Sequence, residues 1–512
     1  MFADRSDALV DDAPHRGYGV AVTPGVRGPC ALVTGYGPAN RLLTWRDGAL
    51  RDVATPAVAD EGRHAIGVVA ADLDADGDEE LYVHNTDAYE GECRDTDLLL
   101  DPVEVRPDHP EVRWRDLFGL AANADRGNFR AGRSVAALDR YGTGRYGVFV
   151  ACYGVPSRFY ELGDDGQLSD MAEAVGLDLD AGARSLYAGP VASDRMDLFV
   201  GVERGPNRLF YNDSGHFREV AADAGVADPE TNARGVVLAD GDLAVGNWET
   251  ESRLYSRASA PVGSAATATA TGEATETPAT GGPTGDDANA GDPDAVANGG
   301  SPSPEDATAA GDRLSIERFV DAAPASFAEP TRIRNVVAAD FDNDGRIELF
   351  CNTMGARNRL FRRGADGWRA IDPGDAAEAR GLGTGAAVAD FDGDGALELL
   401  VVHGELAAQP LSLYGVDDAA ERGWIRVRPT TQYGAPARGA TVTVETAERS
   451  RTAVVCAGSG YLCQMEPVAH FGLGDERPER LTVRWPDGRE ATLERPAERT
   501  EHEVSHPMAP RF

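Results

Sequence analysis

The sequence contains no lysine, so all 49 of its basic residues are arginines. They stand against 85 aspartates and glutamates, and the formal net charge of the 512 residues is −36. Such a charge argues against binding to nucleic acids and to anionic membranes, whose phosphates repel it. A lysine-free acidic surface favours adaptation to high salt, where molar salt shortens the screening length to about 3 Å. The alternative is an ordinary acidic secreted protein.

Long apolar runs are also missing. No stretch approaches the roughly 20 apolar residues that a transmembrane helix needs, so membrane insertion is not expected. Residues 1–7 lack the apolar core of a signal peptide, which predicts a cytoplasmic location.

Two further absences concern chemistry. The six cysteines show no C-x-x-C spacing, so a structural zinc site is not expected. Cys456 and Cys463 could form a disulfide across one loop. The favoured interpretation is that both are simply small buried residues. His470 lies in a glycine-flanked turn that neither a G-x-S-x-G nor an H-E-x-x-H motif accompanies, which favours a structural histidine. The sequence therefore predicts that the chain is not an enzyme.

Three acidic segments share the pattern D-x-D-x-D-G-x-x-E-L. Carboxylates at positions 1, 3, 5 and 9 converge if the loop curls around one point, and they repel each other strongly without a cation. Hard oxygen ligands in a flexible loop suit Ca²⁺ better than the stricter octahedral Mg²⁺, so about three calcium sites are predicted. The predicted side-chain ligands are Asp72, Asp74, Asp76 and Glu80, then Asp340, Asp342, Asp344 and Glu348, then Asp390, Asp392, Asp394 and Glu398.

An EF-hand and a metal-free turn fit these segments less well. An EF-hand loop runs twelve residues between two helices, whereas short apolar runs typical of β-strands flank these segments. An acidic β-turn without metal would account for one copy, but less readily for three copies in phase with their flanking strands.

The acidic segments belong to a longer repeat of four predicted strands, which occurs seven times and predicts a seven-bladed β-propeller over residues 1–418. The loops of the first, third, fourth and fifth copies have lost most of their carboxylates. The third copy keeps Asp139 alone, and no calcium is expected there. Phe2–Asp4 has the pattern of the outer strand that the seventh copy lacks, so we expect it to close the ring.

Residues 258–312 interrupt the fifth copy. They are rich in Ala, Thr, Gly, Asp, Pro and Ser and contain no aromatic residue and no arginine, which predicts a disordered insert. Residues 316–321 then supply the outer strand of the same blade. After the last repeat, residues 423–505 alternate in the manner of a small antiparallel β-sandwich.

The acidic segments resemble the FG-GAP or VCBS repeat of integrin-α-like propellers. Gly458–Leu462, His470–Gly474 and Trp485–Gly488 resemble the ASPIC/UnbV domain of cartilage acidic protein-like chains. The resemblance implies that each loop joins the first two strands of a blade and that position 7 offers a backbone carbonyl. Asp78, Arg346 and Ala396 would then be ligands through their carbonyl oxygens. The resemblance also makes an extracellular location the alternative to a cytoplasmic one.

The predicted function is a non-catalytic, calcium-stabilised propeller that binds a protein or matrix ligand. The alternative is a propeller that binds or cleaves carbohydrate. Aromatic and arginine side chains around the central channel would favour the alternative, and small apolar side chains would favour the first hypothesis.

Overall fold

A computed structural model describes residues 1–10, 12–104, 112–258 and 316–510. These residues form one compact unit, so the boundary between residues 418 and 423 stays a prediction. The predicted disordered insert lies outside the described residues, apart from Ala258.

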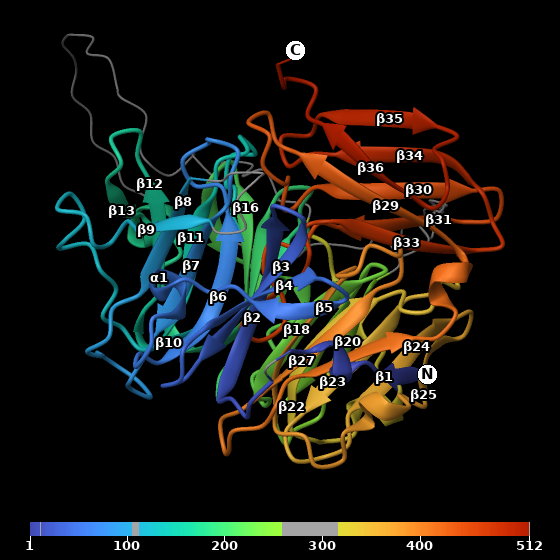
Figure 1. Ribbon diagram of the computed structural model, residues 1–512, viewed down its shortest axis with the longest axis horizontal. Helices are drawn as coiled ribbons and strands as arrows, with labels where there is room; N and C mark the ends of the chain where they lie inside the picture. The colour runs from blue at the N-terminus through green and yellow to red at the C-terminus, as the bar shows by residue number, and fades with distance from the viewer. Residues whose placement is uncertain (11, 105–111, 259–315, 511–512) are drawn as a thin grey trace, which may run out of the picture. The chain divides into compact units, whose positions relative to one another are not determined.

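Four-stranded antiparallel sheets recur along the chain, as the repeats predicted (Figure 1). Their strands follow one another in sequence, except that β1 (Phe2–Asp4) joins the last sheet and β32 (Cys463–Gln464) adds a fifth strand to the first. The first two sheets contain β2 (Gly17–Gly25), β3 (Gly28–Gly35), β4 (Arg41–Arg46) and β5 (Ala49–Asp52), then β6 (Ala65–Ala71), β7 (Glu80–Asn85), β8 (Leu98–Glu104) and β9 (Arg113–Asp116).

The third and fourth copies share an eight-stranded sheet because the end of β11 also pairs with β14. Its strands are β10 (Gly132–Leu138), β11 (Gly147–Pro156), β12 (Arg158–Leu162), β13 (Leu168–Asp170), β14 (Asp180–Gly189), β15 (Asp197–Val202), β16 (Arg208–Asp213) and β17 (His216–Glu219).

The fifth sheet spans the interruption of the repeat. It contains β18 (Ala233–Ala239), β19 (Asp242–Asn247), β20 (Arg253–Arg257) and β21 (Phe319–Asp321). Strand β21 pairs with β20, so the residues on the two sides of 259–315 belong to the same sheet.

The last two repeats also form four-stranded sheets. They contain β22 (Ile333–Ala339), β23 (Glu348–Thr353), β24 (Arg359–Gly364) and β25 (Gly367–Ile371), then β26 (Gly383–Ala389), β27 (Glu398–His403), β28 (Ser412–Val416) and β1 (Phe2–Asp4). Strand β1 pairs antiparallel with β28, and in Figure 1 its dark blue ribbon lies among strands of the late chain.

The first strands of the sheets contact one another in sequence. Strand β2 contacts β6, and the contacts continue through β10, β14, β18, β22 and β26, which contacts β2 again. Apolar side chains fill the space between neighbouring sheets; Val20, Val33, Ala387 and Leu400, for example, share one cluster. This closed series fits the predicted seven-bladed propeller.

The C-terminal strands form two further sheets that share one apolar core. One sheet contains β33 (Ala469–Gly474), β29 (Gly423–Thr430) and β36 (Thr500–Ser505); the other contains β31 (Ser450–Val454), β30 (Thr441–Thr446), β34 (Pro478–Arg484) and β35 (Glu490–Glu494). Strands β29 and β36 run parallel, so the predicted sandwich is not wholly antiparallel.

One segment of the predicted sandwich belongs instead to the ring. Strand β32 (Cys463–Gln464) pairs in parallel with β2, and Gly460 N donates to Val236 O (2.6 Å). Gly460 has φ +73°, and a Cβ atom there would lie 1.9 Å from Asn335 Oδ1. The close approach therefore requires glycine.

Helices are short and connect the strands. They are α1 (Pro56–Ala59), α2 (Ala172–Val175), α3 (Ala221–Ala224) and α4 (Ala325–Ala328), with 3₁₀ turns at Ser6–Ala8, Asp375–Ala377 and Ala419–Glu421. Among the described residues, no helix is long and apolar enough to cross a membrane.

Candidate metal centres

The three acidic loops join the first and second strands of their sheets, as the resemblance implied. In each, the carboxylate at position 1 accepts a hydrogen bond from the glycine N–H at position 6. The N···O distances are 3.2 Å for Asp72, 2.9 Å for Asp340 and 3.1 Å for Asp390. These bonds curl each loop around its first carboxylate.

The remaining acidic positions also bond to loop backbone. The glutamate at position 9 accepts from the N–H at position 2, at 2.6 Å for Glu80, 3.1 Å for Glu348 and 2.8 Å for Glu398. Aspartates at positions 3 and 5 each accept from the N–H two residues further on, which is the geometry of an Asx-turn. These bonds involve Asp74, Asp76, Asp342, Asp344, Asp392 and Asp394.

Three carboxylates converge in each loop, with one oxygen from each lying within 4.8 Å of the others. The converging groups are Asp72, Asp74 and Glu80, then Asp340, Asp342 and Asp344, then Asp390, Asp392 and Glu398. Positions 1, 3 and 9 therefore form two of the clusters, and positions 1, 3 and 5 form the third. Asp76, Glu348 and Asp394 lie outside these groups.

The clusters fit a hard cation. Glu80 Oε1 and Asp340 Oδ1 are buried and have no hydrogen-bond partner among the described residues, and an unpartnered buried oxygen is costly. Burial raises the pKa of Asp72 and of Asp340 to about 7 and that of Asp390 to about 6. A bound Ca²⁺ would offset this unfavourable charge through oxygen ligands of the type that calcium prefers.

The clusters differ in how many arginines already face them. In the described part of the chain, no ion pair reaches the metal-ligand carboxylates of the 72–80 loop. Asp390 faces Arg426 at 3.5 Å. In the 340–348 loop, Arg362 bonds to Asp342 (2.7 Å) and Glu348 (2.6 Å). Before any cation binds, arginines therefore compensate the negative charge of the 340–348 loop more than that of the other two loops.

Further arginines reach the 340–348 loop. Arg451 lies 3.3 Å from Asp340, and Arg422 lies 3.3 Å from Asp342. Arg362 also lies 3.4 Å from Asp344, so it contacts three acidic residues of this loop.

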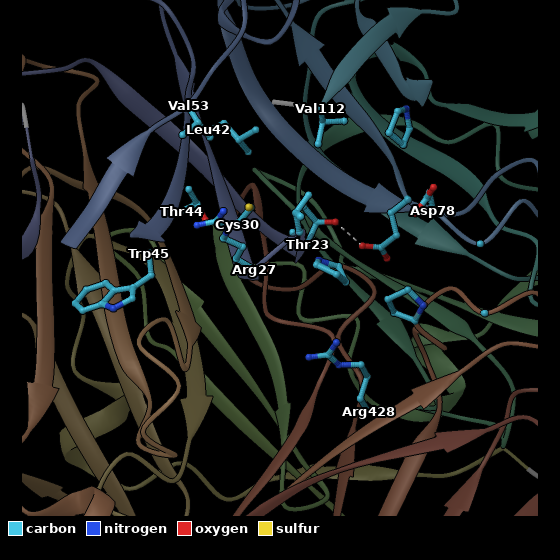
Figure 2. A pocket seen from close by; sticks show the side chains of 18 of the residues that line it. Thr23, Arg27, Cys30, Leu42, Thr44, Trp45, Val53, Asp78, Val112 and Arg428 are labelled. Atoms are coloured by element: carbon cyan, nitrogen blue, oxygen red, sulfur yellow. Dashed lines mark hydrogen bonds between the residues drawn. The ribbon is translucent and has the colours of Figure 1, made fainter. Parts of the chain in front are cut away.

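The residues at position 7 are the predicted carbonyl ligands. Arg346 is exposed and Ala396 has no polar side chain. Asp78 lines a pocket of about 250 Å³ beside its loop (Figure 2). There Thr23 Oγ1 donates to Glu79 Oε2 (2.8 Å), the dashed line beside Thr23 in Figure 2. The carbonyl oxygens remain the groups that the prediction assigns to the metal.

The degenerate third loop keeps the backbone fold without the cluster. Asp139 accepts from the N–H groups of Thr143 (2.9 Å) and Gly144 (2.5 Å), as the first carboxylate of an intact loop does. It is not part of any cluster of potential metal ligands among the described residues. Asp139 thus organises its loop alone.

The C-terminal strands pack directly on the acidic loops. Gly474 N donates to Asn343 O (2.9 Å), and a Cβ at Gly472 would lie 2.4 Å from Asp340 Oδ2. A Cβ at Gly395 would overlap the Trp424 ring. Any cation in these loops would lie at the contact between the ring and the C-terminal sheets.

Comparison with known proteins identifies the family. The family model described as "ASPIC and UnbV" matches residues 430–511, and the "FG-GAP-like repeat" model matches residues 340–401. The chain is 36% identical over 516 residues to cartilage acidic protein 1 of Mus musculus, covering 94% of this chain and 70% of that protein. The chain belongs to the cartilage acidic protein 1 family. The identity is also 36% to the Homo sapiens and Xenopus tropicalis proteins, with 68% of each covered.

In this family member, His470 is a structural residue that contacts the 340–348 loop. Its Nε2 lies 2.6 Å from Asn343 Oδ1, and burial holds its pKa well below the ordinary value. The neighbouring Gly472 and Gly474 permit the close approach described above.

The sequence also contains one H-E-x-x-H match that the sequence reasoning missed, at residues 502–506. It lies on strand β36 and its end, where side chains four residues apart are separated by roughly 13 Å. His502 Nε2 lies 2.9 Å from Ala497 O, and His506 Nε2 lies 3.2 Å from Asp487 Oδ2. The motif binds zinc from a helix, so it carries no such function here.

An Asn-Arg pair recurs at the start of the third strand of several repeats, as in Asn40-Arg41 and Asn207-Arg208, and its asparagine caps a strand end. Asn40 Oδ1 accepts from Gly35 N and its Nδ2 donates to Val58 O. Asn207 bonds in the same way to Val202 N and Val226 O. All six cysteines, including Cys456 and Cys463, are free.

Proposed function

We propose that this chain is a non-catalytic, calcium-stabilised β-propeller that serves as a binding scaffold for a protein or matrix ligand. The observation that carries the proposal is the shared hydrogen-bond pattern of the three acidic loops, each with three converging carboxylates. Membership of the cartilage acidic protein 1 family supports a scaffold over an enzyme. It also favours the extracellular alternative; nothing supports the cytoplasmic prediction.

Carbohydrate binding is the second candidate function, and one observation favours it. Four arginines and several aromatic side chains meet in a single pocket at the centre of the ring. A lining of this type is the one expected for a carbohydrate ligand.

Calorimetric titration is expected to detect about three calcium ions per chain, with the 340–348 loop binding most weakly because an ion there competes with Arg362. Saturating calcium stabilises the folded chain, by about 2.7 kcal/mol per site at one hundred times Kd. Asp74→Ala, Asp342→Ala and Asp392→Ala are each expected to remove one site. Asp139→Asn is the matched control in a degenerate loop and should remove none.

Two results would contradict the predicted calcium sites. Identical unfolding with and without a chelator at fixed ionic strength, together with no bound calcium, would show that the segments are acidic turns. If all three alanine variants still bind the full number of calcium ions, the ions bind at other positions in the chain.

Without calcium, the free energy of unfolding is expected to fall as the pH rises from about 4 to about 7. Asp72 and Asp340 have folded pKa values of about 7 against an ordinary 3.8, so the folded chain holds protons that the unfolded chain releases in this window. Calcium displaces these protons, and its affinity should therefore weaken as the pH falls. Urea unfolding at pH 5 and 7.5, with calcium and after its removal, measures both effects. A metal-free chain that is more stable at pH 7.5 would contradict the expectation.

A further inference from the structure

Every first strand of the ring carries a β-bulge near its beginning, at the opposite end from the acidic loops. A bulge redirects the side chain of the extra residue. The residues within these irregularities include Tyr18, Ile66, Arg133, Arg184, Arg234, Arg334 and Thr384. All of them except Thr384 line one pocket of about 330 Å³. Strands far apart in sequence thus direct the side chains at equivalent bulge positions into the same pocket.

The pocket holds more positive than negative charge. Its four arginines are at most 6% exposed, yet among the residues that the structure describes only Glu203 and Glu405 pair with them. Glu203 is shared between Arg184 and Arg234, whose Nη2 lies 2.8 Å from Glu203 Oε1. The third acidic lining residue, Asp87, is held instead by Arg94, which does not line the pocket.

Arg133 has no carboxylate partner among the described residues. Its guanidinium donates to the carbonyl oxygens of Gly132 (2.5 Å) and Tyr89 (3.0 Å). The Nε atoms of Arg234 and Arg334 are buried without a hydrogen-bond partner in the described part of the chain. Burial and the neighbouring arginines lower the pKa of Arg334 to about 10. Buried charge without compensation strongly destabilises a protein, so the site favours an incoming anion.

A tyrosine from the C-terminal segment lies among these arginines. Arg334 stacks over the Tyr461 ring with its guanidinium carbon 5.2 Å from the centroid. Burial opposes ionisation of this phenol, but the four arginines lower its pKa to about 8. The phenol is therefore mostly neutral at pH 7 and leaves the excess positive charge in place.

Aromatic rings form the rest of the wall. The rings of Tyr18 and Tyr36 lie 5.4 Å apart, Trp248 lies against Arg334, and Tyr89 is 56% exposed. Flat rings can pack on the C–H face of a pyranose, while guanidinium groups bond to carboxylate or sulfate in a bidentate manner. The volume is at the lower end for ligand pockets and fits a small ligand unit.

We propose that this arginine-lined pocket binds an anionic sugar unit through its carboxylate or sulfate group. The proposal rests on the proposed binding function and names its ligand class, but it does not depend on calcium in the loops. The pocket is cationic although the chain as a whole carries a charge of −36, so it selects for an anion against the overall field.

The test is calorimetric titration of the full chain, with calcium present, by four probes. They are an unsulfated oligouronate, the same oligosaccharide with its carboxyl groups reduced to alcohols, a sulfated neutral oligosaccharide and a tetraglutamate peptide. The uronate or the sulfated sugar is expected to bind at least about tenfold more tightly than the reduced one, since bonds to charged groups are the strong ones. The uronate and sulfate arms identify which anionic group is recognised.

Two variants place the ligand. Arg334→Gln is expected to weaken binding about tenfold, and Tyr89→Ala, at an exposed position, should weaken it without affecting folding. Arg357→Gln is the matched control, since Arg357 does not line the pocket and its guanidinium pairs with Asp372 at an exposed position. If Arg334→Gln does not fold, Tyr89→Ala decides.

Three results would overturn the proposal: equal affinity for the reduced sugar, native affinity in both variants, or binding of the peptide alone. Calcium stoichiometry measured on the same samples separates the two proposals. Loss of sugar binding with three bound ions contradicts only the pocket, and sugar binding without bound calcium contradicts only the metal sites.

Discussion

Removal of residues 1–12 is expected to destabilise the whole ring, because strand β1 closes it. Phe2 is 3% exposed and packs edge-on against Phe341 and Phe350, with ring centroids 4.9 and 6.1 Å apart. Phe2 N donates to Pro373 O (3.1 Å), and Arg5 N donates to Leu413 O (2.8 Å). The truncation would lose this packing and expose the edge of β28. Phe2→Ala alone should cost about 3–5 kcal/mol.

Calorimetry in calcium measures both changes, and Phe129→Ala serves as the control because Phe129 is 48% exposed. The control should leave the melting temperature nearly unchanged. A truncated chain that melts with the full-length chain would show that the ring closes without β1.

The strands and acidic loops were predictable because their signals are local. Each loop is set by carboxylates within nine residues, and the Phe2–Asp4 pattern matched the strand that the last repeat lacked. The arginines of the 340–348 loop were not predicted. Arg362 lies opposite Glu348 in the β23–β24 pair, so it depends on the strand register, whereas Arg451 reaches the loop from the C-terminal sheets. No local pattern encodes that second contact.

The ring segment around Tyr461 was misplaced for a related reason. The sequence places it between strands of the sandwich, and contiguity suggested that it belongs there. Its backbone instead bonds to the first strands, as in Tyr461 N to Asn335 Oδ1 (3.0 Å) and Leu462 N to Ser134 Oγ (2.9 Å). Strand β32 spans only two residues, too few for a recognisable pattern.

The central arginines did leave a signal. Each of four consecutive first strands carries an arginine near its beginning, at Arg133, Arg184, Arg234 and Arg334. An aligned set of repeats shows the recurrence, but only the bulged register shows that these side chains converge. The recurrence of the arginines was therefore visible in the sequence, but the convergence of their side chains in one pocket was not.

Replacement of Arg438 is expected to destabilise the chain by about 3–5 kcal/mol, since it breaks a buried ion pair and leaves one charge behind. Arg438 is fully buried, and its Nε and Nη2 bond to the two oxygens of Glu79 (2.5 and 2.9 Å). Its Nη2 also donates to Val22 O (2.9 Å) and its Nη1 to Cys456 O (2.8 Å). One side chain thus joins the C-terminal region to two sheets of the ring.

Denaturant unfolding of Arg438→Met tests this, with Arg438→Met/Glu79→Gln as the second variant. The double variant should recover part of the lost stability, because a neutral glutamine at position 79 leaves no unpaired charge in the interior. Arg484→Met is the matched control: Arg484 also reaches the ring, but its pair with Asp194 is exposed and should contribute less than about 1 kcal/mol. Equal losses for Arg438→Met and Arg484→Met would contradict the assignment. A double variant no more stable than Arg438→Met would place the stabilisation in the carbonyl bonds rather than in the charge pair.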